Sequence, residues 1–353
     1  APKPGTTEKA KEEKAKEEST EAAKTETTTT ESATQPSETT TTTTADPALT
    51  SASSGGAFTT DTTTTTTTTS TTPTTTTPTT TNVVLSTTAC TTDCPGTTTT
   101  TTTTTTSLTV PPDHTVSVPE TFSTITMSGG LIDGTDTLTL TGTGTASGTN
   151  TISTVFHNTG TMDVQSGTLV LSSGVNNTSG TLKTGSGATL TLSGSLGNFS
   201  GGTLTGGTYN VLGTMRLPTT TNIVTNAATI ILDGAGSNLY NATSGTTDAL
   251  AGFATNTSSG SFTIQNGRNF SLTSAFNNAG TVTVGSASTL PLSGGGTVSG
   301  TYSIGTSGQV NLTAGTQTFN TGADISGAGL FNVNGGTMTV SATAMSVDNL
   351  ALT

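Results

Sequence analysis

The chain has 353 residues, of which 29% are hydrophobic, 4% aromatic and 8% charged, and its net charge is −12. This composition excludes a conventional globular core, which would need more apolar bulk to offset the entropy lost on folding. It also excludes nucleic-acid binding, because such proteins need clustered Lys and Arg to displace counterions. No run of about 18 apolar residues is present, so the sequence predicts no membrane span.

Residues 1–26 form a charged segment in which Lys and Glu are interspersed with Ala. The pair Glu12 and Lys16 has the i,i+4 spacing that supports a helix. The segment has no apolar face to dock, so we predict that it is disordered or transiently helical. Because the chain begins at Ala1, we also expect that a signal peptide has been removed.

Residues 27–107 are a low-complexity tract dominated by Thr, including an unbroken run from Thr97 to Thr106. Thr is β-branched and stiff, and Pro73 and Pro78 add stiffness, so the tract favours extended conformations. It has little apolar surface to bury, so we predict a disordered Thr-rich stalk that acts as a spacer. Its hydroxyl groups would suit dense O-glycosylation.

Two cysteines, Cys90 and Cys94, lie within this tract. In an oxidising compartment such a close pair favours a local disulfide, with free thiols or pairing between chains as alternatives. A zinc site would need about four ligands, and the two histidines, His114 and His157, are distant in sequence. We therefore predict no metal and no cofactor.

Residues 108–353 have a different texture, with short apolar alternations between Gly and Asn turns. In residues 137–141, for example, Leu138 and Leu140 would face one side of a strand and the Thr hydroxyls the other. Gly and Asn tolerate the left-handed conformations that tight corners require. The pattern predicts an all-β repeat domain over residues 108–353.

A corner phrase of Asn, small residues, Gly and Thr recurs along this domain. It ends at Thr161, Thr181, Thr203, Thr229, Thr281 and Thr301. Successive positions are separated by roughly 20 residues or a few more, a loose period that is typical of a β-solenoid with two or three short strands in each coil. We interpret the single longer step, from Thr229 to Thr281, as two coils.

In a solenoid each strand pairs with its equivalent one coil away, so the core is a narrow column that needs little apolar content. This favours a solenoid of roughly ten to twelve coils, about 50 to 60 Å long, over a β-sandwich, which is the alternative fold. Six phenylalanines are predicted to fill the core: Phe156, Phe199, Phe253, Phe262, Phe270 and Phe276.

Two phrases are especially characteristic: Gly202-Thr-Leu-Thr-Gly-Gly-Thr-Tyr-Asn210 and Phe276-Asn-Asn-Ala-Gly-Thr-Val-Thr-Val284. Over about residues 120–353 the sequence resembles the β-strand-repeat proteins of bacterial cell surfaces. That group includes autotransporter passengers and filamentous-haemagglutinin-like adhesins. The resemblance implies secretion, a right-handed parallel β-helix and a role in attachment or surface architecture.

Acid–base chemistry on a sugar would need paired carboxylates, or an acid beside a base, in one groove. Only Asp133 and Asp136 lie close together, and we interpret them as a polar turn, with a calcium site as the alternative. His114 and His157 lack a Ser or Cys nucleophile nearby and are assigned to loops or corners. We predict no catalytic, cofactor-binding or metal-binding residues and no enzymatic activity.

These features predict a secreted, non-enzymatic protein of the bacterial cell surface that contributes to adhesion, biofilm matrix or a surface layer. The expected partners are polysaccharide or protein components of a surface or matrix, or further copies of the chain. A self-assembling extracellular fibre subunit is an alternative, because the chain reaches Thr353 without an evident cap and an open strand edge favours association.

Two further hypotheses concern binding. Thr-x-Thr ranks on a flat face can order water, which makes ice binding an alternative function, as is a carbohydrate-active solenoid. The variable repeat length predicts, however, that these ranks are out of register between coils. Any binding site would use a shallow face or the loop from Asn238 to Thr255, where Tyr240 and Phe253 break the pattern, although core packing is the favoured role for Phe253.

Overall fold

The computed structural model describes residues 41–44, 64–67, 80–86, 100–111 and 113–353, with side chains from residue 107 onward. The charged segment 1–26, most of the predicted stalk, Cys90 and Cys94 lie outside these residues. The described parts of the stalk are strands, each paired antiparallel with the next: β1 (Thr41–Thr44), β2 (Thr64–Thr67), β3 (Thr80–Ser86) and the first part of β4 (Thr100–Val110).

Every regular element in the described residues is a strand, and three sheets contain all of these strands. The largest sheet continues from β4 through β6 (Glu120–Met127), β8 (Thr137–Ala146), β10 (Val155–Asn158), β11 (Thr161–Val164), β13 (Val175–Asn176), β14 (Thr181–Thr184), β16 (Phe199–Ser200), β17 (Thr203–Val211), β19 (Thr225–Asp233), β21 (Thr255–Asn256), β22 (Ser261–Gln265), β23 (Asn277–Asn278), β24 (Thr281–Val284), β26 (Gly296–Val298), β27 (Thr301–Ile304), β29 (Thr316–Phe319), β30 (Asp324–Ser326), β32 (Thr337–Val340) and β33 (Ser346–Val347).

The other two sheets follow one another along the chain on a second side of the coils. The first contains β5 (His114–Val116), β7 (Gly130–Gly134), β9 (Thr149–Ile152), β12 (Thr168–Leu171), β15 (Thr189–Leu192), β18 (Thr214–Arg216) and β20 (Asn238–Tyr240). The second contains β25 (Thr289–Leu292), β28 (Gln309–Leu312), β31 (Leu330–Val333) and β34 (Leu350–Leu352).

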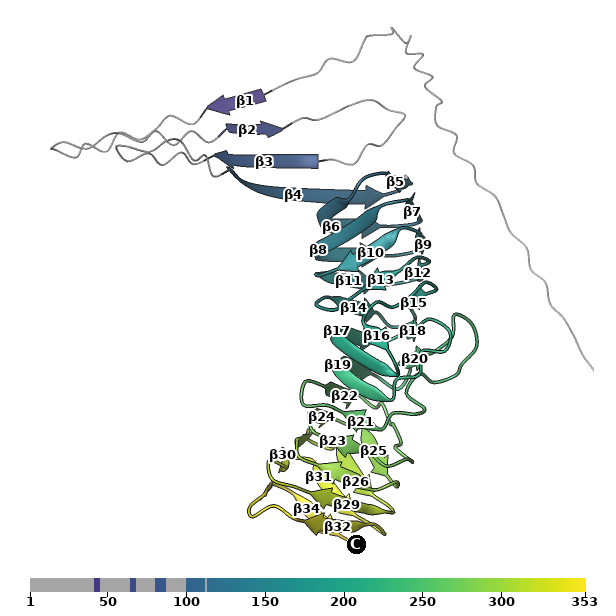
Figure 1. Ribbon diagram of the computed structural model, residues 1–353, viewed down its shortest axis with the longest axis vertical. Helices are drawn as coiled ribbons and strands as arrows, with labels where there is room; N and C mark the ends of the chain where they lie inside the picture. Colours follow the sequence, from purple (N-terminus) through teal and green to yellow (C-terminus); the bar gives the residue numbers. More distant parts are fainter. Residues whose placement is uncertain (1–40, 45–63, 68–79, 87–99, 112) are drawn as a thin grey trace, which may run out of the picture. The chain divides into compact units, whose positions relative to one another are not determined.

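From the end of β4 onward, each coil pairs in parallel with the next and in register, as the stacked arrows in Figure 1 show. One equivalent position runs through twelve coils: Ser107, Thr124, Thr143, Thr161, Thr181, Thr208, Thr229, Ser261, Thr281, Thr301, Asp324 and Ser346. Parallel pairing between successive coils confirms the predicted β-solenoid, since the strands of a sandwich pair mainly antiparallel.

The coil length varies more than the sequence predicted. Ser107 pairs with Thr124 in the shortest coil of this series, whereas Thr229 pairs with Ser261 in the longest, which is nearly twice as long. The predicted alignment of Thr203 with Thr181 is wrong, because Thr181 pairs with Thr208. The difference has a local cause. β16 folds back on the start of β17 in a short hairpin that contains Thr203, so the residue in register with Thr181 is reached only later in β17, at Thr208.

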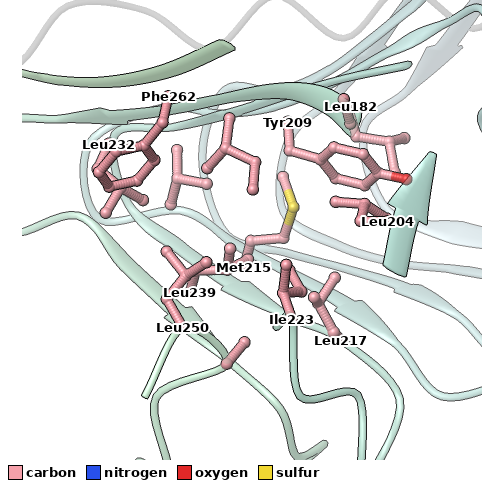
Figure 2. Close-up of a cluster of buried hydrophobic side chains, with 14 of the residues drawn as sticks. Leu182, Leu204, Tyr209, Met215, Leu217, Ile223, Leu232, Leu239, Leu250 and Phe262 are labelled. Carbon is pink, nitrogen blue, oxygen red and sulfur yellow. The ribbon is translucent and has the colours of Figure 1, made fainter. Parts of the chain in front are cut away.

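The core is a column of inward side chains that stack from coil to coil. Leu138 and Leu140 are fully buried, as the alternation predicted, and Leu138 lies in register with Phe156 of the next coil. Five of the six predicted phenylalanines are buried, but Phe199 is only half-buried because it lies in the short hairpin. Figure 2 shows part of this column, with Tyr209, Met215 and their aliphatic neighbours.

Close stacking leaves no room for a side chain at several corners, which predicts a strong position dependence for Gly→Ala substitutions. A Cβ at Gly280 would lie 2.2 Å from the carbonyl oxygens of Gly260 and Thr257, so Gly280→Ala should destabilise the fold by about 1–3 kcal/mol. A Cβ at Gly236 meets nothing within 4 Å, so Gly236→Ala serves as the matched control. Urea unfolding followed by circular dichroism measures both, and equal midpoints would contradict the packing described.

Candidate functional site

The asparagines of the repeated corner phrase point into the solenoid. Asn158, Asn177, Asn226, Asn256 and Asn278 are at most 1% exposed. We name these five residues the asparagine ladder. A buried amide is stable only if its donors and acceptors are paired, so each of these side chains needs partners within the core.

Those partners come from the adjacent coils. The Nδ2 atom of Asn226 donates to Oδ1 of Asn256 at 3.0 Å, and Nδ2 of Asn256 donates to Oδ1 of Asn278 at 2.9 Å. Asn158 donates to Asn177 in the same way at 2.8 Å. Nδ2 groups also donate to the main-chain carbonyl of a following coil, for example from Asn256 to Thr281 at 3.1 Å. The asparagine ladder therefore ties neighbouring coils together and fixes their register.

At the short hairpin, which interrupts the repeat, a buried asparagine pairs with a tyrosine hydroxyl instead of with another asparagine. There Asn198 exchanges hydrogen bonds with the hydroxyl of Tyr209, at 2.9 and 3.1 Å. Burial raises the pKa of the Tyr209 hydroxyl, and hydrogen bonds to Asn198 and Asn177 offset part of this rise. The resulting pKa is about 12. Burial also raises the pKa of Tyr302.

Alkaline pH is therefore expected to weaken the fold. The folded-state pKa of Tyr209 lies above the usual value of 10, so its contribution to stability is complete below pH 10 and is lost as the pH rises towards about 12. Melting temperatures measured from pH 9 to 12 should fall across this window. In the double variant Tyr209→Phe and Tyr302→Phe the melting temperature should fall less across this pH range. An equal fall in the variant and the unmodified chain would show that ionisation of these tyrosines does not cause the loss of stability.

The titratable residues singled out in the sequence remain dispersed. Asp133 and Asp136 lie in β7 and the turn after it, and the described residues contain no group of three His, Cys, Asp or Glu side chains able to hold a metal ion. His114 forms a 2.6 Å contact through Nε2 with Oε2 of Glu120. His157 lies exposed in β10 rather than in a loop or corner, because its outward side chain alternates with Phe156.

The loop from Asn238 to Thr255 divides into a buried part and an exposed part. Phe253 is 2% exposed and packs edge-on against Phe262 and Phe276, which confirms its role in the core. Tyr240 lies at the surface with the guanidinium of Arg216 5.1 Å from its ring centroid. The tyrosine is thus covered by a neighbour from the adjacent coil.

Two rows of hydroxyl side chains lie on the outer face of the largest sheet. The first row consists of Thr124, Thr143, Thr161, Thr181, Thr208, Thr229, Ser261, Thr281 and Thr301. The second lies two residues further along each strand and includes Thr126, Thr145, Thr263, Thr283 and Ser303. In its middle coils this position is held by Asp163, Lys183, Asn210 and Ile231, and Asp163 and Lys183 form a 2.9 Å ion pair.

The expectation that such ranks would be out of register is wrong. Thr281 lies directly between Ser261 and Thr301, and Thr283 lies between Thr263 and Ser303. Variation in coil length is absorbed in the turns and loops, because backbone pairing and the stacked core hold the strands in register. Most of these strands begin with Thr, which could have indicated the rows from sequence. The variable spacing between the strands prevented their alignment.

The fold defines a β-solenoid repeat protein. The sequence matches no family model, and comparisons with curated proteins and with solved structures found no similar chain. Among the described residues no helix is long and apolar enough to cross a membrane.

Proposed function

We propose that the protein is a non-enzymatic structural component of a bacterial cell surface, of the autotransporter-passenger or filamentous-haemagglutinin-like adhesin type. One observation carries the proposal: an equivalent strand position pairs in parallel from coil to coil through twelve coils stacked on one apolar column. A solenoid of this kind repeats the same outward positions many times, which suits multivalent contact with an extended surface rather than capture of one small molecule.

Two other features support this role. Asp133, Asp163 and Asp233 lie on different coils. The described acids that contact a basic side chain do so in two pairs, His114 with Glu120 and Lys183 with Asp163. The asparagine ladder and core aromatics give each coil several stabilising contacts with its neighbours, which suits a protein exposed to mechanical load outside the cell. The proposed partners are polysaccharide or protein components of a surface or matrix.

Attachment of the cells that produce the protein tests the proposal. Antigen-binding fragments raised against the folded chain should label intact cells and reduce the attached biomass several-fold. Fragments against a cytoplasmic protein of the same cells provide the control. Labelling that requires cell lysis, or labelling of intact cells with unchanged attachment, would overturn the assignment.

A further inference from the structure

The hydroxyl rows face solvent in successive coils. Thr281 and Thr283 belong to one coil and Thr301 to the next, and their neighbours Val282 and Tyr302 are fully buried, so these row side chains point outward. None of these three threonine hydroxyls has a hydrogen-bond partner within the described residues. Their hydrogen bonds must therefore be made with solvent.

The spacing of the rows is regular in two directions. Adjacent residues of one row lie about 4.8 Å apart, and the two rows lie about 6.7 Å apart along the strands. Tetrahedral water with hydrogen bonds of about 2.75 Å places second neighbours about 4.5 Å apart and repeats along the ice axis about every 7.3 Å. Both spacings agree to within about a tenth, so water bound to the rows can adopt a lattice close to that of ice over several coils.

Threonine is suited to hold such a layer. Its β-branched side chain is stiff at χ1, so each hydroxyl and methyl group keeps a fixed direction and little entropy is lost when water becomes ordered. The most uniform part of the face is the block formed by Ser261 and Thr263, Thr281 and Thr283, and Thr301 and Ser303, which contains no charged side chain.

We propose that this block, the ice face, binds ice through an ordered water layer. The inference goes beyond surface attachment to proteins or polysaccharides and is independent of it. Ice is the favoured ligand because the described residues of the ice face supply uncharged hydroxyl and methyl groups in a lattice and include no aromatic or charged side chain.

Partition into growing ice tests the proposal with the full chain at micromolar concentration. The chain should enter polycrystalline ice and slow its recrystallisation. Thr281→Tyr places a bulky side chain at the centre of the ice face and should reduce both effects at least ten-fold. Thr115→Tyr makes the same change at an exposed position of β5, where the residue paired with it in the next coil is Asp133 rather than a hydroxyl side chain, and should leave both effects unchanged.

Folding of the variants is followed by circular dichroism, and Thr281→Val supplies a second test if Thr281→Tyr disturbs the strand. Valine keeps the shape of threonine but removes the hydroxyl, so it should weaken ice partition by a smaller factor. Exclusion of the unmodified chain from ice overturns the proposal. Equal loss in Thr281→Tyr and Thr115→Tyr overturns it as well, because the effect would then not belong to this face.

Discussion

Asn256→Ala is expected to lower the free energy of unfolding by about 3 kcal/mol or more, because it leaves several buried polar groups without partners. The Oδ1 atom of Asn278 loses its donor, and the Nδ2 atom of Asn226 loses one acceptor. The carbonyl of Thr281 also loses a hydrogen bond from the side chain. The substitution adds a small cavity at a fully buried position.

The matched control is Asn334→Ala, because Asn334 is exposed and its side chain has no hydrogen bond in the described structure. Its expected effect is within about 0.5 kcal/mol. Urea titrations followed by far-ultraviolet circular dichroism compare the two variants. Similar midpoints for Asn256→Ala and Asn334→Ala would show that the asparagine ladder does not stabilise the coils.

Phe253→Ala is expected to cost about 3–5 kcal/mol, the range found when a buried aromatic side chain is truncated. Phe253 touches one aromatic ring of its own coil, Phe262 at a centroid distance of 5.0 Å, and one of the next coil, Phe276 at 5.1 Å. Each edge-to-face pair adds about 0.5–1.5 kcal/mol to the burial of area. The variant therefore loses contacts with more than one coil.

Phe199→Ala provides the comparison, because Phe199 is only half-buried. This substitution should lower the free energy of unfolding by less than half as much as Phe253→Ala. Thermal melts of the two variants give the relative effect. If Phe253→Ala melted at or above the temperature of Phe199→Ala, Phe253 would not be part of the core, and its assignment to a ligand-binding loop would become the better explanation.

Much of the fold was predictable because strand alternation acts locally. The alternation at Leu138 and Leu140 identified the inward face, and the recurring Thr positions gave the number of coils. The hairpin at Phe199 was not predictable, since the corner phrase ending at Thr203 has the same composition as a true corner. Only pairing with the neighbouring coil distinguishes the two.

The features of the candidate sites were less accessible from sequence. Asn is a common turn residue, so the sequence assigns Asn226 and Asn278 to corners, and their burial follows only once the next coil covers them. The hydroxyl rows depend on pairing between residues whose separation along the chain changes from coil to coil, as it does between Thr229 and Ser261 in the longest coil. A fixed period in the sequence cannot align such positions.

Coils that stack continuously and in register hold residues of distant coils at a fixed separation, which the distance between two spin labels measures. The labels are attached to Thr124→Cys and Thr281→Cys, which point the same way from exposed strand positions, in a chain carrying Cys90→Ser and Cys94→Ser. Seven ladder steps separate the two sites, which predicts a narrow distribution centred at about 34 Å. A broad distribution like that of the chain in denaturant, or a narrow one centred far from this value, would contradict the stacked solenoid.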